Sequence, residues 1–117
     1  MDGKDDPAAA VRASLSGFAP KLIDYTDEVL FGDLWRRPQL SKRDRSLVTI
    51  AMLTALYRVN ELPFHLKLGR ENGLSQEEIV ETLTHAAFYA GWPAAMSAVN
   101  IAKSVLDPQP APDHPNV

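Results

Sequence analysis

Residues 41–57 read SKRDRSLVTIAMLTALY, and this stretch decides the fold class of the chain. From Leu47 to Tyr57 it is apolar nearly all round, which is typical of a buried helix, although its β-branched residues would also suit a strand. The run is longer than a usual strand and no turn signal interrupts it, so we predict a helix. Ser41 and Asp44 have the spacing of a capping pair and mark the start of this helix.

Helical signals also precede this stretch. We predict one helix over residues 8–18 and a second over residues 20–31, because Pro20 suits a first helical turn, where its missing N–H costs little. Residues 32–40 contain a glycine, a tryptophan and a proline, and we expect them to form an irregular connection.

Three further helices are predicted after this stretch. Asn60 can cap the first of them, and Pro63 then falls in the opening turn, where it is tolerated. Asn72 and Gly73 form a natural stop signal. The chain between these signals is therefore expected to be helical.

A second capping pair, Ser75 and Glu78, opens the next predicted helix, and Gly-Trp-Pro at residues 91–93 separates it from the last one. Small residues crowd both helices, which predicts close helix pairing. No alternating strand pattern appears, so we predict an all-α fold of about six helices. Apolar residues recur at helical spacing: Ile79, Leu83, Ala86 and Ala90 in the first, and Ala94, Ala98, Ile101 and Val105 on one face of the last.

The length and composition indicate a single domain. The chain has 117 residues, of which 45% are apolar, so it can bury one modest core. We expect a partly helical N-terminal extension over residues 1–19, a helical domain over residues 20–106 and a Pro-rich flexible tail over residues 107–117.

Charge and hydropathy narrow the choice of partners. The formal net charge is −3 and the basic residues are scattered, so we expect no nucleic-acid partner. There is no run of about eighteen apolar residues, and the N-terminal MDGKDDPAAA lacks the apolar core of a signal peptide. We therefore expect a cytoplasmic protein with no membrane contact.

The chain contains no cysteine, which excludes disulfides, thiolate zinc sites and thiol redox chemistry. There is also no HxxxH or HExxH spacing, so we predict no metal site and no cofactor. One of the three histidines, His114, lies in the Pro-rich tail and is expected to be a solvated bystander.

The most chemically suggestive pair is Glu61 and His65. Their spacing of four places both side chains on one face of a helix, where a carboxylate can orient an imidazole, raise its pKa and stabilise its charged form. Such a pair suits general acid–base catalysis. The same spacing is also common in surface or structural pairs, since Glu61 in a first helical turn is favoured by the helix dipole.

Four other residues are candidates for substrate binding. Arg58 lies three residues before Glu61 and suits a planar carboxylate. His85 and Tyr89, four apart, could form the other wall of a small site or a solvated helix face. Trp92, beside the break at residues 91–93, could line a site, although such tryptophans more often pack as core lids.

Three blocks of the sequence together resemble the carboxymuconolactone decarboxylase-like family. They are FGDLWRRPQLSKRDRSLVTIA at residues 31–51, ELPFH at 61–65 followed by GLSQEEI at 73–79, and YAGWPAA at 89–95. The resemblance covers roughly residues 20–106. It implies the alkylhydroperoxidase D-like helical fold and assembly as a homo-oligomer, a trimer or hexamer.

The resemblance implies one of two chemistries. The branch that resembles alkylhydroperoxidase D uses a CxxC pair followed by a histidine, and the resemblance matches Arg58 and Glu61 to the two cysteines and His65 to the histidine. Thiol peroxidase activity is therefore excluded. The other branch decarboxylates 4-carboxymuconolactone in aromatic catabolism without a cofactor, and it implies a small carboxylate or lactone substrate with Glu61 and His65 as the catalytic pair. The alternative is a non-catalytic helical oligomer or small-ligand binder that retains the fold.

Overall fold

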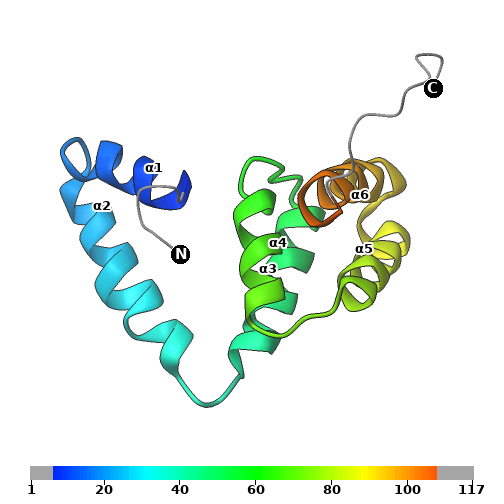
Figure 1. Ribbon diagram of the computed structural model, residues 1–117, viewed down its shortest axis with the longest axis horizontal. Helices are drawn as coiled ribbons and strands as arrows, with labels where there is room; N and C mark the ends of the chain where they lie inside the picture. The colour runs from blue at the N-terminus through cyan, green and yellow to red at the C-terminus, as the bar shows by residue number, and fades with distance from the viewer. Residues whose placement is uncertain (1–6, 108–117) are drawn as a thin grey trace. The chain divides into compact units, whose positions relative to one another are not determined.

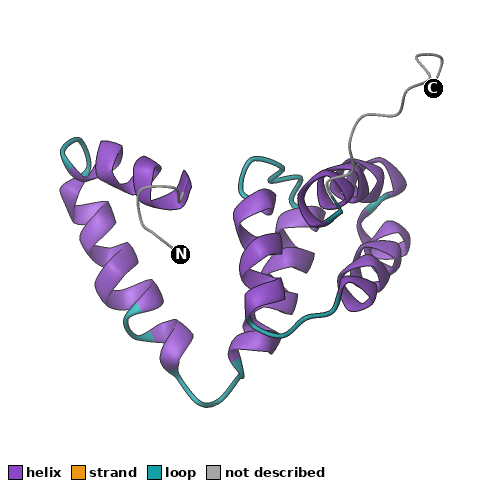
Figure 2. Cartoon of the chain, in the orientation of Figure 1, coloured by secondary structure: helices purple, strands orange, loops and turns teal. Residues whose placement is uncertain are grey.

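The computed structural model describes residues 7–107, and every regular element within that range is helical (Figures 1 and 2). The all-α prediction is thus confirmed. None of the described helices has the length and apolar character needed to cross a membrane. The expected tail after Asp107, including His114, lies outside the described residues.

The chain divides into two compact units, with the boundary between Lys42 and Arg43. In the first unit the helix expected over residues 20–31 forms, but its second half has π-helical hydrogen bonding, which the hydrophobic pattern did not indicate. Arg12 forms an ion pair with Asp27 and lowers the pKa of that carboxyl through a hydrogen bond. The elements are α1 (Pro7–Ser16), α2 (Pro20–Tyr25), the π-helix Thr26–Phe31 and a short 3-10 helix (Leu34–Arg36).

Gly32 ends the π-helix at a point of close backbone approach. A Cβ atom at this position would lie 2.5 Å from the carbonyl oxygen of Asp27 and 2.8 Å from that of Glu28. Real Cβ atoms do not come this close to backbone oxygens, so a side chain here requires the π-helix to shift. Just beyond it, Trp35 is buried and its ring centroid lies 5.8 Å from that of Phe31.

We predict that Gly32→Ala destabilises the first unit by about 1–3 kcal/mol, because backbone cannot yield as a flexible side chain can. Gly17→Ala is the matched control, since a Cβ at Gly17 meets nothing within 4 Å. Urea unfolding followed by Trp35 fluorescence in a Trp92→Phe background measures both variants. An unchanged midpoint for Gly32→Ala would contradict the close approach.

The second unit contains four helices packed around one apolar core. Asn72 Nδ2 donates a hydrogen bond to the buried Ser46 Oγ at 3.0 Å, which links the end of α4 to α3. The helices are α3 (Lys42–Ala55), α4 (Leu62–Glu71), α5 (Gln76–Ala90) and α6 (Trp92–Leu106) (Figure 1). The buried core cluster consists of Ile50, Leu62, Leu66, Leu74, Ile79, Leu83, Ala98 and Ala102.

Helix α3 forms as predicted, but it is buried on one face only. Ser46, Ile50 and Thr54, each four residues apart, are fully buried. Val48 and Met52 are 41% and 58% exposed, so the expectation that this apolar helix is buried all round is wrong for the single chain. Helical spacing allows only one side of α3 to face the core, and its other apolar side chains remain on the surface.

The helix termini follow local rules closely. Ser75 Oγ accepts from the Glu78 N–H while Glu78 Oε1 accepts from the Ser75 N–H, which is the predicted capping box at α5. The hydrogen bond from the Ser75 N–H is the main cause of the lowered pKa of Glu78, and the nearby Arg43 lowers that pKa further. At α4 the N-cap is Glu61 rather than the predicted Asn60, with Pro63 in the first turn as expected.

Helix α6 begins directly after Gly91 and packs against α4 and α5. Its buried residues are Ala95, Ala98 and Ala102, so the core-facing stripe includes Ala98 as predicted but is otherwise rotated from the expected face. Of that expected face, Ile101 and Val105 pack at the edge of the core. The rotation brings alanines inward and allows the close pairing of α5 and α6.

Candidate functional site

An arginine–glutamate pair occupies the turn between α3 and α4. The Nε and Nη2 atoms of Arg58 both lie 3.0 Å from Glu61 Oε1, and the two side chains are 63% and 43% exposed. Exposed pairs of this kind contribute little stability. The pair places the Arg58 guanidinium against Glu61 at the surface of the second unit.

His65 lies one turn further along α4 and is half-buried. Its backbone N–H donates to the Glu61 carbonyl oxygen at 3.4 Å, and its ring meets the Phe64 ring edge-to-face with centroids 5.0 Å apart. Burial lowers the pKa of His65 from the ordinary value of 6.5. The direction is opposite to the one expected from a neighbouring carboxylate, because desolvation is the dominant effect here.

Two aromatic pairs lie at the end of α5. The rings of His85 and Tyr89 stack with centroids 4.7 Å apart, and both side chains are exposed. Phe88 meets Trp92, the first residue of α6, edge-to-face at 5.4 Å. Trp92 is 58% exposed, so it does not serve as a core lid in the single chain.

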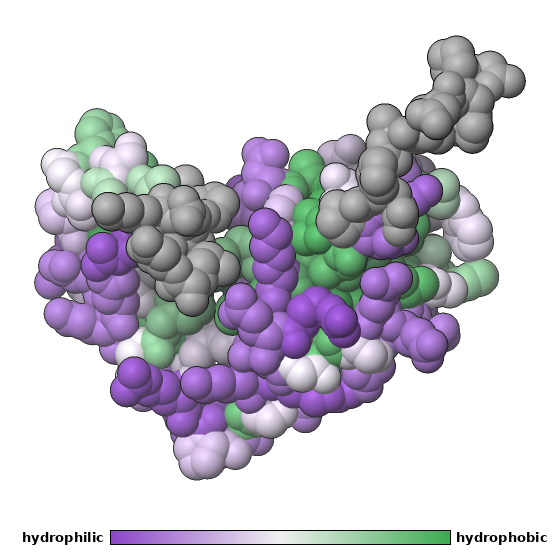
Figure 3. Space-filling model, in the orientation of Figure 1, coloured by the Kyte–Doolittle hydropathy of each residue, from purple (hydrophilic) through white to green (hydrophobic). Residues whose placement is uncertain are grey.

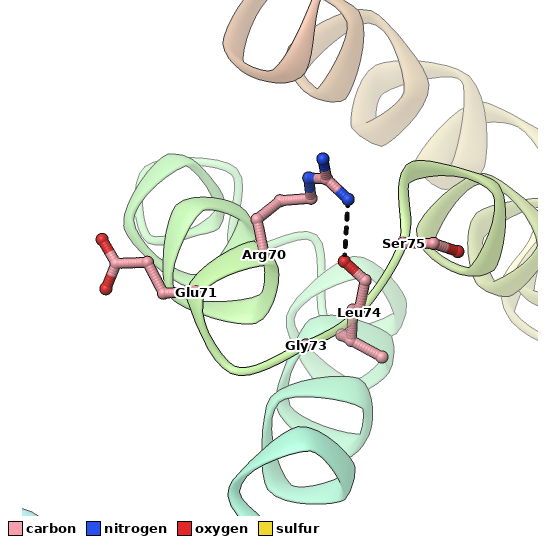
Figure 4. Close-up of a pocket in the computed structure, with 5 residues that line it drawn as sticks. All are labelled: Arg70, Glu71, Gly73, Leu74 and Ser75. Carbon is pink, nitrogen blue, oxygen red and sulfur yellow. Dashed lines mark hydrogen bonds between the residues drawn. The ribbon is translucent and has the colours of Figure 1, made fainter.

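Two hollows in the second unit lie away from all of these residues. One is an open depression of about 460 Å³ where α4 turns into α5, and Arg70 Nη1 donates to the Leu74 carbonyl oxygen beside it (Figure 4). The other, of about 190 Å³, is apolar and lies between α5 and α6. Hydrophobic residues are visible on the surface of the second unit among hydrophilic ones (Figure 3). Neither hollow is lined by Arg58, Glu61 or His65.

The structure therefore brings together Arg58 and Glu61, with His65 one turn away, and separately His85 with Tyr89. Sequence reasoning missed Phe64 and Phe88, whose rings contact His65 and Trp92. It also missed Tyr57, a non-glycine residue with a φ of 57° immediately before Arg58. Within residues 7–107, no three histidine, aspartate or glutamate side chains gather as a metal-holding group.

The family model described as "Carboxymuconolactone decarboxylase family" matches residues 20–104, which include the Arg58–Glu61 turn and His65. The chain belongs to the carboxymuconolactone decarboxylase family. This confirms the resemblance inferred from the three sequence blocks, and it agrees with the all-helical fold.

Two relatives of this family member bear the names of decarboxylases. The 4-carboxymuconolactone decarboxylase of Acinetobacter baylyi is 38% identical over 93 residues, which are 80% of this chain and 69% of the relative. The nitrosuccinic acid decarboxylase npaB of Metarhizium robertsii is 31% identical over 80 residues, which are 68% of this chain and 56% of that relative.

The lowered pKa of His65 predicts a pH-dependent stability. Well above pH 6.5 the imidazole is neutral in both the folded and the unfolded chain, so protonation of His65 does not reduce the free energy of unfolding. As the pH falls below 6.5, the unfolded chain takes up a proton before the folded chain does, so stability is lost. Thermal unfolding between pH 8 and about pH 5 should show a smaller fall of Tm for His65→Gln than for the wild type. Parallel curves would contradict the burial of His65, and His85→Gln serves as the exposed control.

Proposed function

We propose that this chain is a cofactor-independent decarboxylase of a small lactone or carboxylic acid, of the kind met in the breakdown of aromatic compounds, and that it works in the cytoplasm. The observation that carries the proposal is the likeness to two decarboxylases within a family match that includes Arg58, Glu61 and His65. The same candidate residues supply what the reaction requires: a cation for a carboxylate and a group that can carry a proton.

The proposed reaction breaks the bond between a ring carbon and a carboxylate. The electron pair of that bond enters the conjugated lactone as a dienolate while CO2 departs. The protonated imidazole of His65 then delivers its proton to carbon, and His65 recovers a proton from solvent. One proton is consumed for each CO2 released, and no oxidant or reductant is needed.

His65 must be protonated for this step, although burial lowers its pKa in the free chain. An anionic substrate beside the imidazole reverses this, because an opposite charge favours the protonated form. Substrate binding therefore increases the protonated fraction of His65 at a given pH.

Arg58 and Glu61 act one after the other in this proposal. In the free chain the guanidinium is held on Glu61 Oε1. A carboxylate of the substrate can take over Arg58 through a bidentate contact. Glu61 is then released to face His65, one turn away on α4, where it stabilises the imidazolium and orients the ring. His85, Tyr89 and Trp92 are proposed to form a further part of the substrate surface.

Replacement of His65 tests the reaction directly. Decarboxylation of 4-carboxymuconolactone, followed by CO2 release, is expected to fall roughly 10²–10⁴-fold in His65→Gln, since the proton donor is lost. Arg58→Lys should raise KM more than it lowers kcat, because it removes bidentate binding. Lys67→Gln, an exposed position on the same helix, is the control. Unchanged turnover in His65→Gln would eliminate the mechanism.

The pH profile provides an independent test. kcat/KM reports the free enzyme, so it should decline with rising pH with a midpoint below 6.5, because the proton donor is lost above the lowered pKa of His65. kcat reports the complex and should decline at a higher pH. Profiles that coincide would count against substrate-induced protonation.

Assembly of several copies is also proposed, as a trimer or hexamer. The support is the amount of large apolar surface that the single chain exposes, including Met52, Leu56 and Phe88 at 58%, 70% and 73%. Such surface is typical of interfaces between subunits.

A non-catalytic oligomer that retains the fold is the alternative proposal, and it is favoured by the absence of Glu61 and His65 from the linings of both hollows.

Sedimentation velocity at micromolar concentration is expected to give a trimer or hexamer. Met52→Lys should shift the chain toward monomer, because it places a charge on the exposed apolar side of α3. Asn100→Lys, at an exposed polar position of α6, is the matched control and should sediment as the wild type does. A monomeric wild type would refute the assembly.

A further inference from the structure

Helix α3 ends in a Schellman motif that places Tyr57 in the left-handed conformation. The Arg58 N–H donates to the Leu53 carbonyl oxygen at 2.8 Å, and the Tyr57 N–H donates to that of Thr54 at 3.1 Å. This pair of hydrogen bonds defines the motif, and its C′ residue takes a positive φ, here 57°. Glycine is the usual residue at C′ because a Cβ atom is strained there.

Helix α4 in the same chain ends in the same motif with the favoured residues. The Leu74 N–H donates to the Gly69 carbonyl oxygen at 2.9 Å, and the Gly73 N–H donates to that of Arg70 at 3.1 Å. Gly73 occupies the positive-φ position, and Leu74 after it is buried, as the motif prefers. The turn after α4 therefore has glycine at the positive-φ position and a buried apolar residue after it. The turn after α3 has neither.

The strain at Tyr57 is not offset by burial of its ring. Tyr57 is 58% exposed, and its hydroxyl accepts a long hydrogen bond of 3.5 Å from Ser97 Oγ on α6. Arg58, in the place that Leu74 takes after α4, points its exposed side chain to Glu61 instead of the core. Tyr57 is thus a strained and exposed aromatic residue directly before Arg58 in the chain, and departures of this kind from the local rules are concentrated at functional sites.

We propose that Tyr57 contacts the substrate beside Arg58, an inference that rests on the proposed function. Its ring offers a flat face to a planar unsaturated lactone. A tyrosine hydroxyl carries one O–H donor and also accepts hydrogen bonds, so it can donate to the lactone oxygen while it stays in contact with Ser97. That oxygen gains negative charge when CO2 leaves, so the hydrogen bond strengthens in the transition state.

Tyr57→Gly separates this role from a structural one. Glycine relieves the backbone strain, so Tm should rise by roughly 2–6 °C, while kcat/KM should fall at least about tenfold because the substrate contact is lost. Tyr57→Phe should lower kcat more than it changes KM, since only the hydroxyl acts on the dienolate. Tyr25→Phe, which removes an exposed hydroxyl from α2, is the control and should leave both constants unchanged.

Three results would overturn the inference. They are a Tyr57→Gly variant that is more stable and equally active, one that is less stable than the wild type, and one that has changed its oligomeric state. The last two would assign the ring a structural or interface role.

A wild-type chain without turnover would refute the proposed reaction but not the substrate contact. In that case calorimetric titration with γ-carboxy-γ-butyrolactone, a saturated lactone acid, tests Tyr57 separately. Weaker binding by Tyr57→Gly than by the wild type supports the contact, and equal affinity, or no binding by the wild type, overturns it.

Discussion

The absence of a side chain at Gly69 sets how α4 sits in the second unit. A Cβ atom there would lie 3.0 Å from Ile50 Cδ1 and 3.1 Å from Leu74 Cδ1, so both side chains pack directly against the α4 backbone. Gly69 shares one helix face with the fully buried Leu62 and Leu66. Close packing of this kind leaves α4 a single rotation about its axis, and every other residue of the helix takes its environment from that rotation.

The chemistry of the candidate site follows from the same rotation. His65 lies three residues after Leu62 and four before Gly69, which places it at the edge of the buried face and explains its partial burial and lowered pKa. Glu61, one turn earlier, falls outside that face and meets Arg58 at the surface. The acid–base group and the exposed ion pair are thus two consequences of one packing arrangement.

What could be predicted from the sequence depends on how local its physical cause is. The capping box at Ser75 and the stop at Gly73 involve neighbours within a few residues, and both were predicted correctly. Chain-wide packing decides which apolar residues of α3 face inward and how α6 is rotated, so those predictions were wrong or incomplete. The π-helical turn was missed because hydrophobic spacing over residues 20–31 suits an α-helix as well. At the site, the residue types were available from the sequence, but the Arg58–Glu61 pairing depends on turn geometry and the pKa of His65 on burial.

The two chain reversals that bracket α4 differ in how much they contribute to the stability of the second unit. The turn at Gly73 and Leu74 follows the local rules and adds a fully buried leucine to the core. The turn at Tyr57 and Arg58 breaks those rules and exposes both side chains, so it adds strain and little burial. A marginally stable chain tolerates such a turn only where the rest of the unit compensates, and the core around Leu62 and Leu66 provides that compensation. Because Leu62 and the C-terminal turn fix α4, the exposed side chains of Tyr57, Arg58 and Glu61 just before it are not needed for packing of the core.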